Sequence, residues 1–232
     1  MQSGIQANFM WSRKNIYASG TNRVFLLVEW YGGTIRQNRR RSTPKLIARD
    51  VQLLLWLEPN VSLVKVHGAK PIKSINDSIM IPLGHLYDGV KQFIAIEFAF
   101  QPQTVGLHGV LSAQWRFKEK NKERMKELPV REIYIQYTYH MGLLQQPEDF
   151  YVKKHIKLLE TPGILKEAIR LFEHGDLVQG EWMLRRKGDE LLINAVRHSD
   201  VRLLEEATML YQLSERYVKT YTSRGKAQII SG

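Results

Sequence analysis

The spacing of apolar residues restricts the fold of this chain more than any other sequence feature, because it changes once, near residue 146. Before that point apolar and polar residues alternate, as around Val24, Leu26, Val28 and Trp30. A period of two is typical of strands that bury one face of an antiparallel sheet. The first part of the chain is therefore expected to be all-β.

Turn-forming residues divide this part into short segments. Pro59-Asn60 and Asp88-Gly89 have the chemistry of tight turns. Short strands without a helical pattern between them indicate a β-sandwich, which we assign to residues 1–145. The expected strands are 8–17, 22–31, 46–57, 61–67, 78–82, 90–101, 109–118 and 130–140.

Beyond residue 146 the apolar spacing becomes three and four residues, which indicates amphipathic helices. Thr161-Pro162 has the character of a helix start, so the first helix is expected to restart or to kink there. Gly175 is suited to end that helix, and Asp176 to cap the next one.

The next helix is expected over 177–187, with its end at Gly188-Asp189, and Asp200 is expected to cap a last helix over 201–222. Residues 146–223 are thus predicted to be a helical region and 224–232 a flexible tail. The predicted fold class is α+β: an antiparallel β-sandwich followed by a C-terminal α-helical hairpin or bundle.

The net charge of +11 is concentrated in the first part of the chain. Residues 1–145 contain 20 Lys and Arg against 10 Asp and Glu, whereas residues 146–232 contain 14 against 13. A field of this sign favours acidic partners, namely nucleic acid, anionic lipid or an acidic protein face. The densest positive charge lies in and after the loop 32–45, and its candidate anion- or partner-binding residues are Arg36, Arg39, Arg40, Arg41, Lys45 and Arg49.

A second group of basic residues lies between 116 and 126 and is interleaved with glutamates. Mixed signs favour a solvated hairpin tip over a binding site. The members are Arg116, Lys118, Lys120, Lys122, Arg124 and Lys126, with Glu119, Glu123 and Glu127 between them.

Sequence motifs give little support to catalysis. The chain has no cysteine, no HExxH and no G-x-S-x-G, and Gly32-Gly33 is not followed by the Lys of a phosphate loop. We therefore expect no enzyme activity, no catalytic or metal-binding residue and no cofactor. The lack of cysteine suits a reducing, cytoplasmic compartment, and no apolar run is long enough to cross a bilayer as a helix.

Aromatic residues at period-two positions favour ordinary sandwich core and face sites over a recognition groove. These residues are Trp115, Tyr134, Tyr137 and Tyr139. In the helical region we expect a buried seam between helices, rather than a ligand pocket, to be formed by Leu165, Phe172, Trp182 and Met183.

The order of these segments resembles a known family. Residues 43–71 and then 79–100 (IMIPLGHLYDGVKQFIAIEFAF) resemble the region after the von Willebrand factor A (VWA) domain in bacterial VWA-domain proteins. In those proteins a "v-lGdL-aGe" block follows a strand pair, and Leu83-Gly84-His85-Leu86 with Asp88-Gly89 fill its places. Residues 9–30 resemble the strands before that domain, and 155–185 its C-terminal helical segment.

The VWA domain itself is missing. Its metal-site signature, Asp-x-Ser-x-Ser, would lie between the second strand and residue 43, where only Gly32–Ser42 stands. Natural loss of the domain and excision of an insert both account for this. The resemblance implies that the two flanks of the former insertion fold together as one sandwich. It does not imply metal-dependent ligand binding, because no residue here matches that motif.

These observations predict a non-catalytic scaffold or adaptor that binds other proteins, resembling the non-VWA part of bacterial VWA-domain proteins. Exposed sandwich edges and an apolar helix face also favour a homodimer. The alternative is a nucleic-acid-binding protein that uses the basic 36–49 segment. A third hypothesis attaches the same segment to an anionic membrane.

Overall fold

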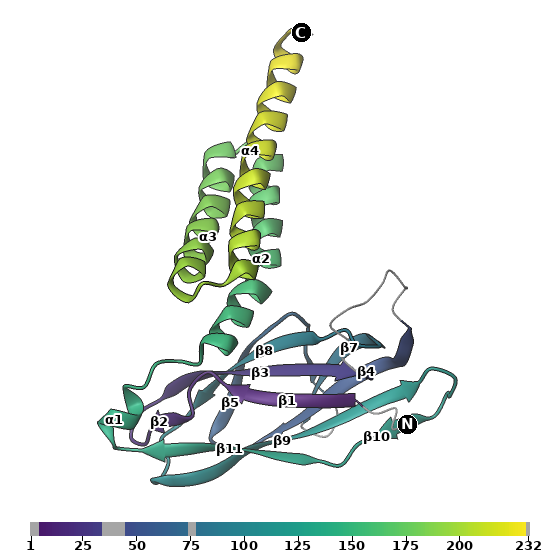
Figure 1. The fold of residues 1–232 in the computed structure, drawn as a ribbon, viewed down its shortest axis with the longest axis vertical. Coiled ribbons are helices and arrows are strands. Elements are labelled where there is room, and N and C mark those ends of the chain that lie inside the picture. Colours follow the sequence, from purple (N-terminus) through teal and green to yellow (C-terminus); the bar gives the residue numbers. More distant parts are fainter. Residues whose placement is uncertain (1–4, 34–44, 74–77, 231–232) are drawn as a thin grey trace. The chain divides into compact units, whose positions relative to one another are not determined.

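The computed structural model of the chain describes residues 5–33, 45–73 and 78–230. Two sheets form within these ranges (Figure 1). In the first sheet every neighbouring pair of strands is antiparallel, and β3 lies between β1 and β8. Its strand order is β1 (Ile5–Trp11), β3 (Asn22–Gly32), β8 (Gln92–Phe100) and β5 (Val61–His67).

The second sheet is antiparallel except where β2 and β11 run parallel. A short additional strand, β10 (Met125–Glu127), pairs with β9 beyond the main path. The strand order is β2 (Asn15–Tyr17), β11 (Arg131–Thr138), β9 (Gly106–Glu119), β4 (Leu46–Leu57), β7 (Ile79–Tyr87) and β6 (Ile72–Lys73).

The alternating residues meet in one core between the two sheets. Leu26 and Val28 of β3 and Leu53 of β4 are fully buried there. The rings of Trp30 and Trp115 lie with centroids 5.7 Å apart and join the two sheets. We call the loop 32–45 the arginine-rich segment. The segments before and after it share hydrogen bonds and one core, as the resemblance implied.

The strand prediction is wrong in detail at three places. The segment expected as one strand, 8–17, forms two strands in different sheets, because the chain crosses between the sheets at Ser12–Lys14. The Ser12 carbonyl turns away to accept from the Asp149 amide at 2.9 Å. β7 continues to Tyr87, beyond the predicted end at 82. The strands β6 and β10 are too short to show a period.

The helices are α1 (Met141–Leu144), α2 (Phe150–Glu173), α3 (Leu177–His198) and α4 (Val201–Ile230). α2 does not restart at Pro162, which lies inside it. The Thr161 hydroxyl donates to the Lys157 carbonyl one turn earlier at 3.1 Å, as threonines inside helices commonly do. The predicted boundary at Gly175 and Asp176 is confirmed: Gly175 has φ +84°, and Asp176 accepts from the Gln179 amide at 3.1 Å.

The predicted helix end at Gly188-Asp189 is wrong, because α3 continues through it to His198. Gly188 serves close packing: a Cβ there would lie 3.1 Å from the Tyr211 ring. Asp200 accepts from the Leu203 amide at 3.0 Å, as predicted. α4 continues to Ile230, through most of the segment expected as a tail, and 231–232 lie outside the described residues.

The chain divides into two compact units, residues 1–156 and 157–232, so α2 begins in the first and continues in the second. The second unit has its own buried seam, which includes Phe172, Leu184 and Leu210. The Phe172 and Tyr217 rings stack with centroids 5.2 Å apart. Among the described helices, none is both long and apolar enough to cross a membrane.

Candidate functional site

Only part of the predicted basic site falls within the described residues. Arg36, Arg39, Arg40 and Arg41 lie outside them. Lys45 is exposed and directly precedes β4. Arg49 lies in β4, where its guanidinium pairs with Glu123 and its Nη2 is 3.4 Å from the Lys122 carbonyl. Of the six candidates, the structure therefore locates two, near the same end of β4.

The start of β4 is irregular, and this irregularity positions its charged side chains. Pairing registers shift between Arg49 and Gln52 on the β9 side and at several points on the β7 side. Asp50 adopts φ +51°, a left-handed conformation that aspartate tolerates better than most residues. Its carboxylate reaches Lys118 of β9 at 3.0 Å. Bulges of this kind re-aim side chains at the rim of a sheet.

The β9–β10 hairpin meets this part of β4. The backbone amide of Lys120 donates to the Ile47 carbonyl at 3.1 Å. The hairpin tip therefore lies beside the point where the arginine-rich segment joins β4. Lys45 and Arg49, the described members of the first basic cluster, are thus neighbours of the second cluster in space, although the two are far apart in sequence. We call the described residues of this region the basic end: Lys45, Arg49, Lys118, Lys120, Lys122, Arg124 and Lys126.

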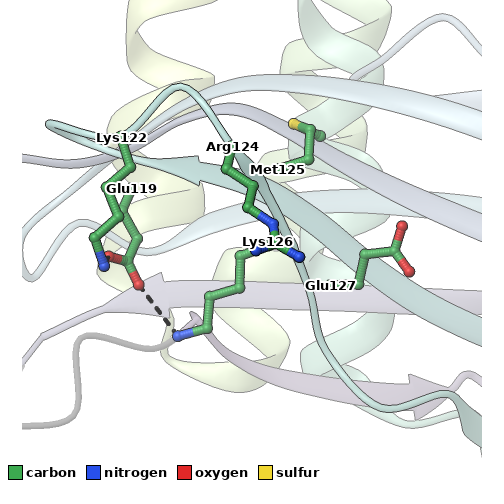
Figure 2. Close-up of a pocket in the computed structure, with 6 residues that line it drawn as sticks. All are labelled: Glu119, Lys122, Arg124, Met125, Lys126 and Glu127. Carbon is green, nitrogen blue, oxygen red and sulfur yellow. Dashed lines mark hydrogen bonds and ion pairs between the residues drawn. The ribbon is translucent and has the colours of Figure 1, made fainter.

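Ion pairs fix much of the hairpin. Glu119 accepts from Lys122 at 2.5 Å and from Lys126 at 3.2 Å, and Figure 2 shows the second contact. Hydrogen bonds from both lysines lower the pKa of Glu119. Among the described residues, Lys120 and Arg124 make no ion pair, so the tip presents uncompensated positive charge.

Two open depressions lie along this hairpin. One, of about 600 Å³, is lined by the six residues drawn in Figure 2 and carries cations and anions together. The other, of about 510 Å³, lies on the outer face of the sheet beside Asp50, Gln52 and Lys118. Met125 lines both, and each combines charged side chains with apolar surface.

A second charged cluster, which the sequence analysis missed, lies on the outer face of the first sheet. Glu29 of β3 is 3% exposed, and its carboxylate accepts from Lys91 at 2.6 Å and from the Tyr151 hydroxyl at 2.6 Å. The His155 ring stacks on Phe93 with centroids 4.2 Å apart. These contacts attach the first turns of α2 to the sheet. In the sequence, this cluster was indicated only by Glu29, a carboxylate at an outward-facing position of an otherwise apolar strand.

The aromatic candidates do not form one groove. Trp115 and Tyr137 are buried in the core, whereas Tyr134 is 46% exposed and Tyr139 is 55% exposed. Tyr134 instead covers Gly109 on the neighbouring strand, where a Cβ would lie 3.4 Å from its ring. In the helical unit Phe172 is buried as predicted.

The prediction for Trp182 is wrong. The side chain is 49% exposed, and the Arg186 guanidinium lies 4.9 Å above its ring. Its position on the helix decides this: Gly180 and Leu184, on the opposite side of α3, face the buried seam. Within the described ranges, no group of three or more His, Asp or Glu could hold a metal ion.

No protein-family model matches this sequence, and no curated protein matches it. Solved structures do resemble it. The von Willebrand factor type A protein from Catenulispora acidiphila aligns with a TM-score of 0.51 and 18% identity, over 66% of this chain and 37% of that chain. The ArnB paralog VWA2 from Sulfolobus acidocaldarius aligns with a TM-score of 0.51 and 10% identity, over 94% of this chain and 98% of that chain.

At these identities the likeness concerns the fold alone. This chain spans little more than a third of the Catenulispora protein and nearly the whole of the Sulfolobus protein. Both neighbours carry von Willebrand factor A names, so the fold agrees with the resemblance seen in the sequence.

Proposed function

We propose that this chain is a non-catalytic module that binds another protein, and that the basic end of its sandwich is the binding surface. The observation that carries the proposal is the convergence of the β9–β10 hairpin with the junction of the arginine-rich segment and β4. Positive charge from two distant parts of the sequence gathers there, which suits an acidic partner.

The pattern of charge favours a protein over nucleic acid. Asp50, Glu119, Glu123 and Glu127 stand among the cations of the hairpin. Anions at those positions would repel a continuous phosphate backbone, whereas a folded protein surface can match both signs. The partly apolar floor around Met125 suits the same kind of partner.

We also propose that the arginine-rich segment stands where bacterial VWA-domain proteins carry their VWA domain. Gly89 donates to the Gly32 carbonyl at 2.8 Å, and Asp88 donates to the Lys45 carbonyl at 2.8 Å. One turn therefore holds both ends of the segment close together. Close ends are the geometry in which a whole domain can be inserted without disturbing its host. A bacterial, cytoplasmic protein remains our proposal for its source and location, supported by the cysteine-free sequence.

The test compares two double variants in affinity purification from the native host with quantitative mass spectrometry. Lys120→Glu with Arg124→Glu reverses the uncompensated charge of the hairpin tip. Lys166→Glu with Arg202→Glu makes the same charge change at two exposed helical positions and serves as control. We expect an acidic protein to be lost with the first pair and kept with the second. Identical recovery with both pairs would contradict the proposal.

Nucleic-acid binding is the alternative, favoured by the net charge of +11. It predicts affinity for labelled DNA or RNA that falls steeply with salt and drops when Arg39, Arg40 and Arg41 become Ala. Fluorescence anisotropy measures this affinity as salt is raised from about 50 to about 300 mM, a range in which binding through phosphate contacts weakens strongly. Such a result would favour nucleic acid over a protein as the partner. Co-sedimentation with anionic liposomes tests the membrane hypothesis in the same way.

A further inference from the structure

One face of α3 is apolar and exposed. Val178 is 80% exposed, Trp182 49%, Ile193 58% and Val196 73%. At about 100° per residue, these four positions fall within an arc of about 60° on the helix. The buried residues of α3, such as Leu184 and Leu191, lie on the opposite side. We call the four exposed residues, with Arg186 and Asp189 between them, the α3 stripe.

Two opposite charges occupy the middle of the α3 stripe. The Arg186 guanidinium lies 4.9 Å above the Trp182 ring and has no acidic partner among the described residues. Asp189 is exposed, and one of its oxygens accepts from the Tyr211 hydroxyl at 2.5 Å. This hydrogen bond raises the pKa of Tyr211 to about 12, so Tyr211 stays a donor and holds the Asp189 carboxylate in place. Within the part of the chain that the structure describes, the second oxygen of Asp189 has no hydrogen-bond donor.

The order of residues along the α3 stripe is symmetrical: apolar, apolar, basic, acidic, apolar, apolar. A twofold axis through the stripe between Lys187 and Gly188 would set two α3 helices antiparallel. Every contact would then occur twice, as in any isologous interface. It would place Trp182 against the partner's Ile193, Arg186 against the partner's Asp189, and Val178 within one residue of the partner's Val196.

We propose that two copies of this chain associate through antiparallel α3 helices. A second copy fits the α3 stripe because it supplies an anion for the unpaired Arg186 and apolar side chains for both ends. An anionic lipid surface fits the α3 stripe less well, because it would repel the Asp189 carboxylate. This interface is separate from the basic end, so its failure and the failure of the proposed function are distinguishable.

The dimer is expected to be weak. The stripe from Val178 to Val196 is about 27 Å long, and one helix pair of this length lies at the small end of specific interfaces. A dissociation constant on the order of 10 µM is therefore expected. Sedimentation velocity of the full chain over a range of concentrations measures it. A chain that stays monomeric at concentrations well above this value overturns the proposal.

Charge exchange tests the central pair. Arg186→Asp and Asp189→Arg each place like charges together and should weaken the dimer about tenfold or more. The double variant Arg186→Asp with Asp189→Arg restores opposite charges and should recover dimerisation to within a few-fold of the original. Lys166→Glu, at an exposed position of α2, is the control and should change nothing. A double variant as weak as the single ones would overturn the pairing, provided that circular dichroism shows all variants to be equally helical.

Cross-linking tests the orientation, and the chain has no native cysteine to interfere. Trp182→Cys chains mixed with Ile193→Cys chains should be joined by a short bis-maleimide linker. Neither variant alone should be joined efficiently, because each brings its cysteine opposite a different residue. Efficient linking of Trp182→Cys to itself would instead indicate parallel helices. Linking in no mixture would mean that the α3 stripes of two copies do not meet, and either result overturns the proposal.

Discussion

The sandwich and the helical unit bury apolar surface to different degrees. The sandwich has one continuous core to which both sheets contribute, with Phe98, Phe100 and Phe117 fully buried. The helical unit has a narrow seam, and α3 leaves its other side uncovered. A unit as small as residues 157–232 buries a smaller fraction of its surface than a large domain does. The sandwich therefore encloses its large apolar side chains in its own core, whereas the helical unit leaves an apolar face of α3 exposed.

The two units also bury ion pairs differently. In the sandwich, Glu29 accepts from one lysine and one tyrosine. In the helical unit, Lys187 is 6% exposed and donates to Glu160 at 3.0 Å and to Glu190 at 2.8 Å, and Glu190 also pairs with Lys157. The second arrangement joins α2 to α3.

The largest expected effect comes from the sandwich core. Phe98→Ala should lower the free energy of unfolding by about 3–5 kcal/mol, because it removes a fully buried ring and leaves a cavity. Urea denaturation followed by tryptophan fluorescence measures it. Val64→Ala, at a position 40% exposed on β5, is the matched control and should cost less than about 0.5 kcal/mol. Equal losses for the two variants would contradict the assigned core.

Glu29→Gln should lower the free energy of unfolding by about 2 kcal/mol at pH 7, since it removes the charged acceptor but keeps the shape. The partial exposure of Lys91 limits the loss. Burial alone would raise the pKa of Glu29, but hydrogen bonds from Lys91 and Tyr151 outweigh it and the pKa is lowered.

The sign of the pH dependence follows from this lowered pKa. A carboxylate with a lowered pKa stabilises the fold above its unfolded value, about 4.3, and that contribution is lost as pH falls through the folded value. The difference between the original chain and Glu29→Gln should therefore shrink below about pH 4. A constant difference from pH 7 to pH 3 would show that Glu29 is not the ionised partner.

A smaller effect is expected where α2 and α3 approach closely. A Cβ at Gly180 would lie 2.9 Å from the Phe172 ring and 3.1 Å from the Ala168 carbonyl. Overpacking there should outweigh the gain in helix propensity, so Gly180→Ala should destabilise the helical unit by about 1–2 kcal/mol. Gly163→Ala has open space and should stabilise α2 by about 0.5–1 kcal/mol. Thermal unfolding at 222 nm measures both, and the same sign for the two would refute the close approach.

The smallest effect is expected at the rim of the sandwich. Asp50→Gly relieves a positive φ but removes an exposed ion pair with Lys118, so the two changes should nearly offset each other. Asp50→Ala keeps the strain and loses the ion pair, and should therefore unfold at a lower urea concentration than Asp50→Gly. Urea midpoints separate the two variants, and the reverse order would exclude strain at Asp50.

Much of the architecture follows from local patterns. The change of apolar period near residue 146 separates strands from helices, and Gly175, Asp176 and Asp200 mark helix boundaries correctly. Patterns failed where a distant contact overrides a local preference. Gly188 continues a helix because Tyr211 packs against it, and Trp182 faces solvent because the seam passes along the other side of α3.

The sequence by itself determined that this protein has a β part and a helical part and that its positive charge lies in the first. Periodicity and charge are local properties, so they need no knowledge of which segments meet. Only the tertiary structure decided that 8–17 serves both sheets, that the β9–β10 hairpin lies beside the start of β4, and that Glu29 is buried against the first turns of α2. Those facts depend on contacts between residues far apart in the chain, which no single segment encodes.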